Sequence, residues 1–123
     1  DYAWVFGNAW VSGTARVSGN ARVSDTAWVF GDARVSGNAR VSDTARVSKQ
    51  RDVLVIGPIG SENKHATISP TQDGGNTLTV GCWTGNLDLL RDEVAKRCPD
   101  MAEEYDLVEL LLRHRVAEWA VES

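Results

Sequence analysis

The chain has 123 residues, a formal net charge of −4 and 42% hydrophobic residues. This length allows one compact domain or two small units, and the absence of a run of about 18 apolar residues excludes a membrane-spanning helix. Its two cysteines, Cys82 and Cys98, are too few for a disulfide scaffold and lack the CxxC spacing of a structural zinc site. We therefore expect no metal site.

Residues 1–48 consist of one six-residue unit written eight times. In every unit an Ala and a Val stand two residues apart, so on a strand both side chains point to the same face. One such strand buries too little apolar surface to be stable alone, whereas stacked copies build a continuous core. The repeat therefore predicts a solenoid whose Ala and Val columns are buried over residues 3–47. The units are DYAWVF, GNAWVS, GTARVS, GNARVS, DTAWVF, GDARVS, GNARVS and DTARVS.

The unit Val-Ser-Gly-Asn-Ala-Arg resembles the hexapeptide repeat of left-handed parallel β-helices, and the resemblance covers about residues 1–56. It implies that three units form one coil, so that each residue stacks on the residue 18 positions later. The expected fold class is mainly β: a short left-handed parallel β-helix over residues 1–54, followed by a small α+β module over residues 55–123.

An 18-residue period aligns the residues between Ala and Val into three outward ladders. In one of them Trp10 stacks on Trp28, and Arg46 lies on the indole of Trp28. The Arg-on-Arg steps of the other ladders require solvent or an acidic partner to relieve their repulsion. The predicted ladders are Trp4/Arg22/Arg40, Trp10/Trp28/Arg46 and Arg16/Arg34/Asp52.

After the repeat, the sequence predicts strands separated by turn signals. The first covers residues 53–59 and is broken at Gly57-Pro58, and the second covers residues 65–70. The run Asp-Gly-Gly-Asn at residues 73–76 is a strong turn signal. Alternating apolar and polar residues over 77–83 then predict one further strand, with Leu78, Val80 and Cys82 on one face.

Two helices are expected after the strands. Asn86 is suited to cap the first, which covers residues 87–97 and ends at Pro99. The second begins near Asp100 and has a broad apolar face, which predicts burial on more than one side. The residues of that face are Tyr105, Leu107, Val108, Leu110, Leu111, Leu112, Val116 and Trp119.

The net charge hides an asymmetry between the two halves. Residues 1–54 hold seven basic and five acidic residues, whereas residues 55–123 hold six basic and twelve acidic residues. The β-helix is therefore mildly basic and the second module acidic. Ordinary surface charge accounts for this pattern. A basic face that meets an acidic protein, or more weakly nucleic acid, is the alternative.

Many enzymes with hexapeptide repeats are trimeric acyltransferases, and the resemblance implies a catalytic His and an acyl-CoA bound between neighbouring subunits. This chain departs from that pattern, because its eight repeats contain no His and make fewer than three coils. His65 and His114 stand outside the repeats, lack an oriented partner in the sequence, and are too few for a three-His metal site. We expect no catalytic residue and no cofactor.

A second, weaker resemblance concerns the tail of the chain. The run Ile-Gly-Pro-Ile-Gly-Ser at residues 56–61, then Gly-Cys-Trp-Thr-Gly at 81–85 and a helix, is similar to a tail that follows such repeats in uncharacterised phage and bacterial proteins. By analogy, a small rigid domain of this kind suits a phage inhibitor of a host defence complex, as anti-CRISPR proteins are. The expected location is the cytoplasm of a bacterial host cell.

The sequence therefore favours a non-enzymatic protein that binds a protein partner, since Trp and Arg are enriched in binding hot spots. A degenerate acyltransferase and a structural element of a phage fibre or filament remain alternatives. We also expect the exposed first coil to self-associate, as an end-to-end dimer or as a side-by-side trimer. The predicted binding residues are Trp4, Trp10, Trp28, Arg16, Arg22, Arg34, Arg40 and Arg46, and the predicted oligomer interface is Tyr2, Trp4, Phe6 and Trp10.

Overall fold

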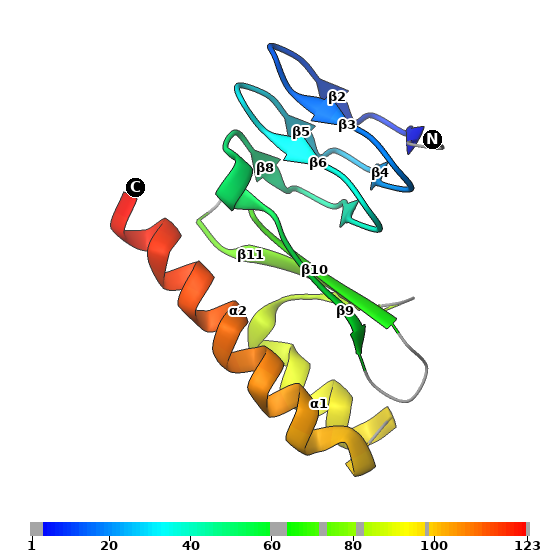
Figure 1. The fold of residues 1–123 in the computed structure, drawn as a ribbon, viewed down its shortest axis with the longest axis vertical. Coiled ribbons are helices and arrows are strands. Elements are labelled where there is room, and N and C mark those ends of the chain that lie inside the picture. Colours follow the sequence, from blue (N-terminus) through cyan, green and yellow to red (C-terminus); the bar gives the residue numbers. More distant parts are fainter. Residues whose placement is uncertain (1–3, 60–63, 72–73, 81–82, 98, 123) are drawn as a thin grey trace.

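Three layers are stacked along the long axis of the molecule (Figure 1). A computed structural model describes residues 4–59, 64–71, 74–80, 83–97 and 99–122. The β-helix forms the first layer, an antiparallel sheet the second and two helices the third, so the sheet lies between the β-helix and the helices. The predicted fold class, a parallel β-helix followed by a small α+β module, is confirmed.

The repeats form short parallel strands that stack with a period of 18 residues. Each strand pairs in parallel with the strand three units later, for example Trp4 with Arg22 and Trp10 with Trp28. The predicted stacking is therefore correct. The strands are β1 Trp4–Val5, β2 Trp10–Val11, β3 Arg16–Val17, β4 Arg22–Val23, β5 Trp28–Val29, β6 Arg34–Val35, β7 Arg40–Val41 and β8 Arg46–Val47, in the sheets β1-β4-β7, β2-β5-β8 and β3-β6.

The paired Ala and Val columns form the core of the β-helix. From Ala21 to Val47 every Ala and Val of these columns is completely buried, which confirms the predicted inward face. The first coil differs, because Val5 is 48% exposed and Val11 and Val17 are only half-buried. No described residue packs above them, so the expectation of burial over the whole of residues 3–47 is wrong for this coil.

In the described repeats, the corners of the β-helix place one residue of each unit from Gly7 onward in the left-handed backbone region. Gly19 has a φ of 65°, and the same corner position is filled by Asp25 and Asp43 with φ values of 58° and 60°. Asp is among the few non-glycine residues that adopt this conformation at moderate cost. Asp25 also stabilises the next corner, since its Oδ2 accepts a hydrogen bond from the Asp43 backbone N–H at 3.2 Å.

Asp52 does not form the third rung of the predicted Arg16/Arg34/Asp52 ladder. It lies in a short 3₁₀ helix, η1 Gln50–Asp52, and is 8% exposed. Its Oδ2 accepts hydrogen bonds from the backbone N–H groups of Ser48 at 2.9 Å and Lys49 at 3.1 Å. The carboxylate therefore stabilises the turn by which the chain leaves the β-helix. Arg16 and Arg34 form a ladder of two rungs.

The second layer is an antiparallel sheet of four strands in the order β12-β11-β10-β9. The predicted break at Gly57-Pro58 is wrong: β9 continues through this cis peptide bond, because Pro is tolerated on an edge strand. The predicted strand over residues 77–83 is instead two paired strands, and its Cys82 lies outside the described residues. The strands are β9 Leu54–Ile59, β10 Lys64–Pro70, β11 Asn76–Val80 and β12 Trp83–Gly85.

Both faces of this sheet are buried. The apolar face packs on the helices and includes Ile68 and Leu78, each completely buried. The polar face packs on the last coil of the β-helix, where Thr67 Oγ1 accepts a hydrogen bond from the Arg40 backbone N–H at 3.1 Å. The sheet therefore closes this end of the β-helix. The residues of the polar face are Thr67, Ser69, Thr77 and Thr79, all at most 5% exposed.

The third layer consists of α1 Leu87–Arg97 and α2 Ala102–Glu122, with the 3₁₀ helix η2 Pro99–Met101 before α2. The predicted cap is confirmed, since Asn86 Oδ1 accepts a hydrogen bond from the Leu89 N–H at 3.2 Å. Among the described residues, no helix is long and apolar enough to cross a membrane. The core of this layer is formed by Leu87, Leu90, Val94, Tyr105, Val108 and Leu112.

The broad burial predicted for the second helix is wrong on one side. Leu112 is completely buried, but Leu107, Leu110 and Leu111 are 66%, 67% and 49% exposed. The reason is geometric: a helix that covers one face of a sheet buries one stripe only, and nothing described lies on its outer side.

The C-terminal part of α2 also contacts η1, at the end of the β-helix. Trp119 Nε1 donates a hydrogen bond to the Arg51 carbonyl oxygen at 2.8 Å, and Arg51 Nε donates to the Glu118 carboxylate at 2.9 Å. The hydrogen bond from Arg51 lowers the pKa of Glu118 below its ordinary value. These contacts attach α2 to the end of the β-helix as well as to the sheet.

Candidate protein-binding surfaces

One side of the β-helix carries two tryptophans and an arginine in a column. Trp10 and Trp28 are 60% and 44% exposed, and their ring centroids lie 6.2 Å apart at an interplanar angle of 37°. The Arg46 guanidinium carbon lies 4.9 Å from the Trp28 ring centroid. The predicted stack of Trp10, Trp28 and Arg46 is therefore present, with a cation–π contact as its last step. We call these three residues the Trp ladder.

A second side carries Trp4, Arg22 and Arg40 at equivalent positions. The Arg22 guanidinium carbon lies 5.7 Å from the Trp4 ring centroid, and Phe6 meets Trp4 edge-on with centroids 6.3 Å apart. The cation and the exposed aromatic rings again lie together, so this side combines charge with apolar surface.

The eight predicted binding residues thus all lie on the outside of the β-helix, but they do not form one site. They are distributed over its three sides, because the three parallel sheets face in different directions. Arg16 and Arg34 form the third side without an aromatic residue. A single partner surface is expected to contact one side, or two sides across a corner.

The first coil ends in an open edge, which we call the open coil end. The N–H groups of Trp4, Trp10 and Arg16 donate to carbonyls of the second coil at 2.9–3.0 Å. Successive residues of a strand direct their peptide groups to opposite sides, so those of Val5, Val11 and Val17 point away from the second coil. No described residue pairs with them. Trp4, Phe6 and Trp10 border this edge and are 46–60% exposed, whereas Tyr2 lies outside the described residues.

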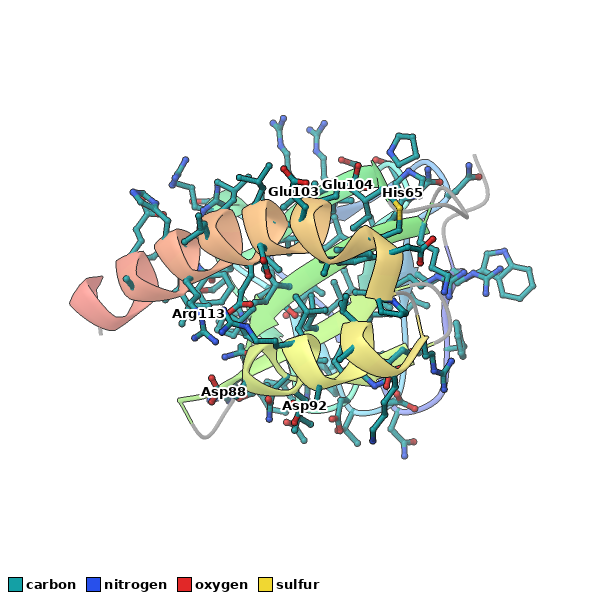
Figure 2. The ribbon with its side chains drawn as sticks, turned by 90° about the horizontal axis from the view of Figure 1, so that it is seen from below. His65, Asp88, Asp92, Glu103, Glu104 and Arg113 are labelled. Carbon is teal, nitrogen blue, oxygen red and sulfur yellow. The ribbon has the colours of Figure 1, made fainter. Side chains whose placement is uncertain are left out.

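The two histidines lie apart from these surfaces and from each other. His65 lies on β10, where its Nε2 is 3.2 Å from Asn38 Nδ2 in the last coil. His114 is exposed on α2. Figure 2 shows His65 at the opposite end of the helical layer from Asp88 and Arg113. Within the described ranges, no group of three or more His, Cys, Asp or Glu side chains is placed to hold a metal ion.

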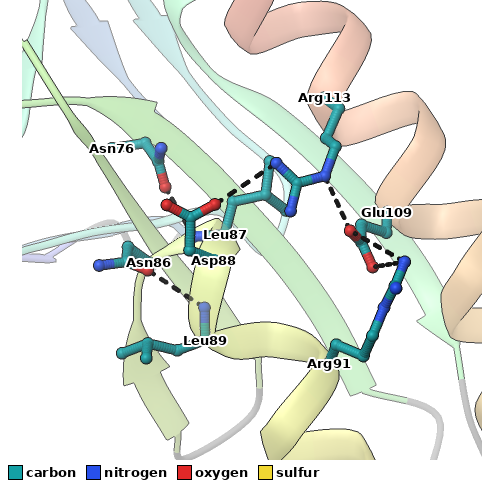
Figure 3. A network of polar contacts seen from close by, with 8 residues as sticks. All are labelled: Asn76, Asn86, Leu87, Asp88, Leu89, Arg91, Glu109 and Arg113. Atoms are coloured by element: carbon teal, nitrogen blue, oxygen red, sulfur yellow. Dashed lines mark hydrogen bonds and ion pairs between the residues drawn. The ribbon is translucent and has the colours of Figure 1, made fainter.

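An ion-pair network around one buried carboxylate joins the two helices and was not predicted from the sequence (Figure 3). Glu109 is 5% exposed and accepts hydrogen bonds from Arg113 Nε at 2.7 Å and Arg91 Nη2 at 3.3 Å. Arg113 also contacts Asp88, and its hydrogen bond to Glu109 raises the pKa of Arg113. The spacing of Glu109 and Arg113 was the only sequence signal. Because the carboxylate is already paired with two arginines, the network fastens α1 to α2.

The family model of the YdcK Beta solenoid repeat matches residues 15–31 and 33–49 of this chain. The match covers much less than half of the chain and lies entirely within the repeats, so it supports the solenoid fold of this part. No curated protein and no solved structure matches the chain.

Proposed function

We propose that this chain is a non-enzymatic binding protein whose β-helix contacts a protein partner through an aromatic and cationic side. The observation that carries the proposal is the Trp ladder, in which two half-exposed indoles and a guanidinium lie on a rigid sheet. Such side chains are already ordered in the free protein, so binding costs little side-chain entropy. Trp and Arg are also the residues that most often dominate binding energy.

The charge distribution favours a partner with an acidic surface. Neighbouring rungs carry arginines on two sides of the β-helix, and an acidic partner relieves the repulsion between them. The pairs are Arg22/Arg40 and Arg16/Arg34. A partner of this kind is steered to the β-helix and away from the acidic second module. Nucleic acid is also acidic and would suit the arginines of the β-helix. We propose a protein partner because the two indoles lie against each other and leave little room for a base between them.

The more specific form of the proposal is inhibition of a host defence complex by a phage protein that acts in the bacterial cytoplasm. It rests on the similarity of the tail to tails of phage and bacterial repeat proteins. Such inhibition requires only that a small rigid domain binds its target, and it requires no catalysis. The arginines of the β-helix suit an acidic surface on that target.

The first test is capture of a partner from bacterial lysate with the immobilised chain. Replacing Trp10 and Trp28 with Ser is expected to reduce the captured protein about tenfold or more, because the loss of two hot-spot residues costs at least ~1.4 kcal/mol. The control is Leu89→Ser, which removes a side chain of similar exposure (49%) from α1. Equal capture by the Trp variant and the wild type would contradict the proposal.

We further propose that the open coil end self-associates, most simply as a two-fold, end-to-end dimer. A two-fold contact turns the strands of the second copy antiparallel, so the free peptide groups of Val5, Val11 and Val17 gain partners. The same contact covers Trp4, Phe6 and Trp10. A side-by-side trimer leaves this edge open.

The second test is light scattering at micromolar concentration. The wild type is expected to form at least a dimer, and Trp4→Ser/Trp10→Ser is expected to weaken this contact because both indoles border the interface. A wild-type monomer would refute self-association and leave these aromatics to a foreign partner. A trimer that the double substitution leaves intact would favour the side-by-side arrangement.

A further inference from the structure

The outer side of α2 carries an apolar stripe that nothing in the described part of the chain covers. Leu107, Leu110 and Leu111, which we call the Leu stripe, have 66%, 67% and 49% exposed side chains. Their spacing of three and four residues places them on one face of the helix. Contiguous apolar surface of this kind marks an interaction site more often than scattered exposed residues do.

The Leu stripe is followed by different polar groups at its two ends, a carboxylate and an imidazole. Glu103 stands four residues before Leu107, and His114 stands four residues after Leu110, so both continue the same helical face. Both are exposed, and Figure 2 shows Glu103 together with Glu104 on the outer edge of α2. Along the helix the face therefore carries a carboxylate, then the three leucines of the Leu stripe, then an imidazole.

Two copies of this face are complementary to each other when the helices run antiparallel. When a second α2 is placed antiparallel, with the two-fold axis near residues 108 and 109, Leu107 of one copy faces Leu110 or Leu111 of the other. The same placement sets Glu103 opposite His114, where an imidazole N–H can donate to the carboxylate. A two-fold contact between identical copies requires a face that is complementary to a second copy of itself, whereas the binding of a different protein does not.

We propose that the Leu stripe is a second self-association surface, in which α2 packs antiparallel on the α2 of another copy. The helices lie at the end of the molecule away from the first coil (Figure 1), so this contact and that of the open coil end can form together. The inference does not depend on the partner proposed for the Trp ladder.

The test separates the two contacts by starting from Trp4→Ser/Trp10→Ser, in which the open coil end is weakened. Sedimentation equilibrium is expected to show a concentration-dependent dimer of this variant. Adding Leu107→Asp/Leu110→Asp is expected to raise the dimer dissociation constant about tenfold or more, since carboxylates then face one another across the axis. Leu89→Asp is the matched control, because Leu89 is as exposed as Leu111 but lies on α1, and it should change nothing.

Charge exchange tests the antiparallel direction. Glu103→Arg and His114→Glu are each expected to weaken the dimer. The two together in one chain are expected to restore it, because the new guanidinium of one copy then faces the new carboxylate of the other. Circular dichroism checks that each variant stays helical. A starting variant that is monomeric throughout, or a double exchange with no restoration, would overturn the proposal. Neither result would bear on capture through the Trp ladder.

Discussion

Replacement of Val29 by Asp is expected to unfold the β-helix. Val29 is completely buried in the middle of the Ala/Val core, and its neighbours above and below are Val11 and Val47. A carboxylate at this position has no basic partner inside the core, and an unpaired buried charge costs about 3–5 kcal/mol. That is comparable with the whole stability of a small domain, about 5–15 kcal/mol. Urea denaturation followed by circular dichroism measures the loss.

The matched control is Val5→Asp, in the same position of the repeat but in the first coil. Val5 is 48% exposed, so at low protein concentration, where the open coil end does not associate, its carboxylate remains in water and the expected loss in stability is below about 1 kcal/mol. The sheet of the second module packs on the last coil, so Val29→Asp should also loosen this module. Equal stability of Val29→Asp and Val5→Asp would show that the Val columns are not the core.

The β-helix could be predicted from the sequence because every coil is built from the same six-residue unit. The Ala/Val spacing and the Gly or Asp corners repeat every six residues, and the resemblance to left-handed β-helices implies three such units per coil. The strand pairs follow the resulting 18-residue period. Asp52 was wrongly placed in a ladder because it stands 18 residues after Arg34, although the residues around it no longer follow the six-residue repeat. Its carboxylate is taken by backbone N–H groups, a local interaction that competes with the ladder.

The second module was predicted less completely, because its elements are defined by contacts between distant segments. Thr67 and Thr79 alternate with apolar residues, a pattern typical of a sheet with one face in water. The last coil of the β-helix covers that face, and the backbone of Arg40 supplies a hydrogen bond to Thr67. Periodicity identifies the two faces of a strand, but it does not show that a polar face will also be buried.

The candidate binding surfaces could also be predicted only in part from the sequence. That Trp10, Trp28 and Arg46 point outward in one column follows from the repeat, and the structure confirms it. How the eight predicted residues divide among the three sides of the β-helix follows from the same period. The Leu stripe was missed because the apolar residues of α2 are spread around the helix, so hydrophobicity alone does not show which leucines face the sheet.

The leucines of α2 can be separated by one pair of substitutions. Leu112→Ala is expected to lower the free energy of unfolding by about 2–5 kcal/mol, because Leu112 is completely buried and its truncation leaves a cavity between α2 and the sheet. Leu111→Ala, at the neighbouring position, is expected to change it by less than about 0.5 kcal/mol, since the side chain is 49% exposed. Ala is a good helix former, so helix propensity contributes little to either value.

Both unfolding curves are to be measured at low protein concentration, where association through the Leu stripe does not contribute to stability. At high concentration Leu111→Ala should lose stability relative to the wild type, because it weakens the contact between copies and leaves the monomer core intact. Leu112→Ala should be destabilised at every concentration. If Leu111→Ala is as destabilising as Leu112→Ala in the dilute monomer, then α2 is buried on both sides, and the outer stripe belongs to the core of one chain and not to an interface.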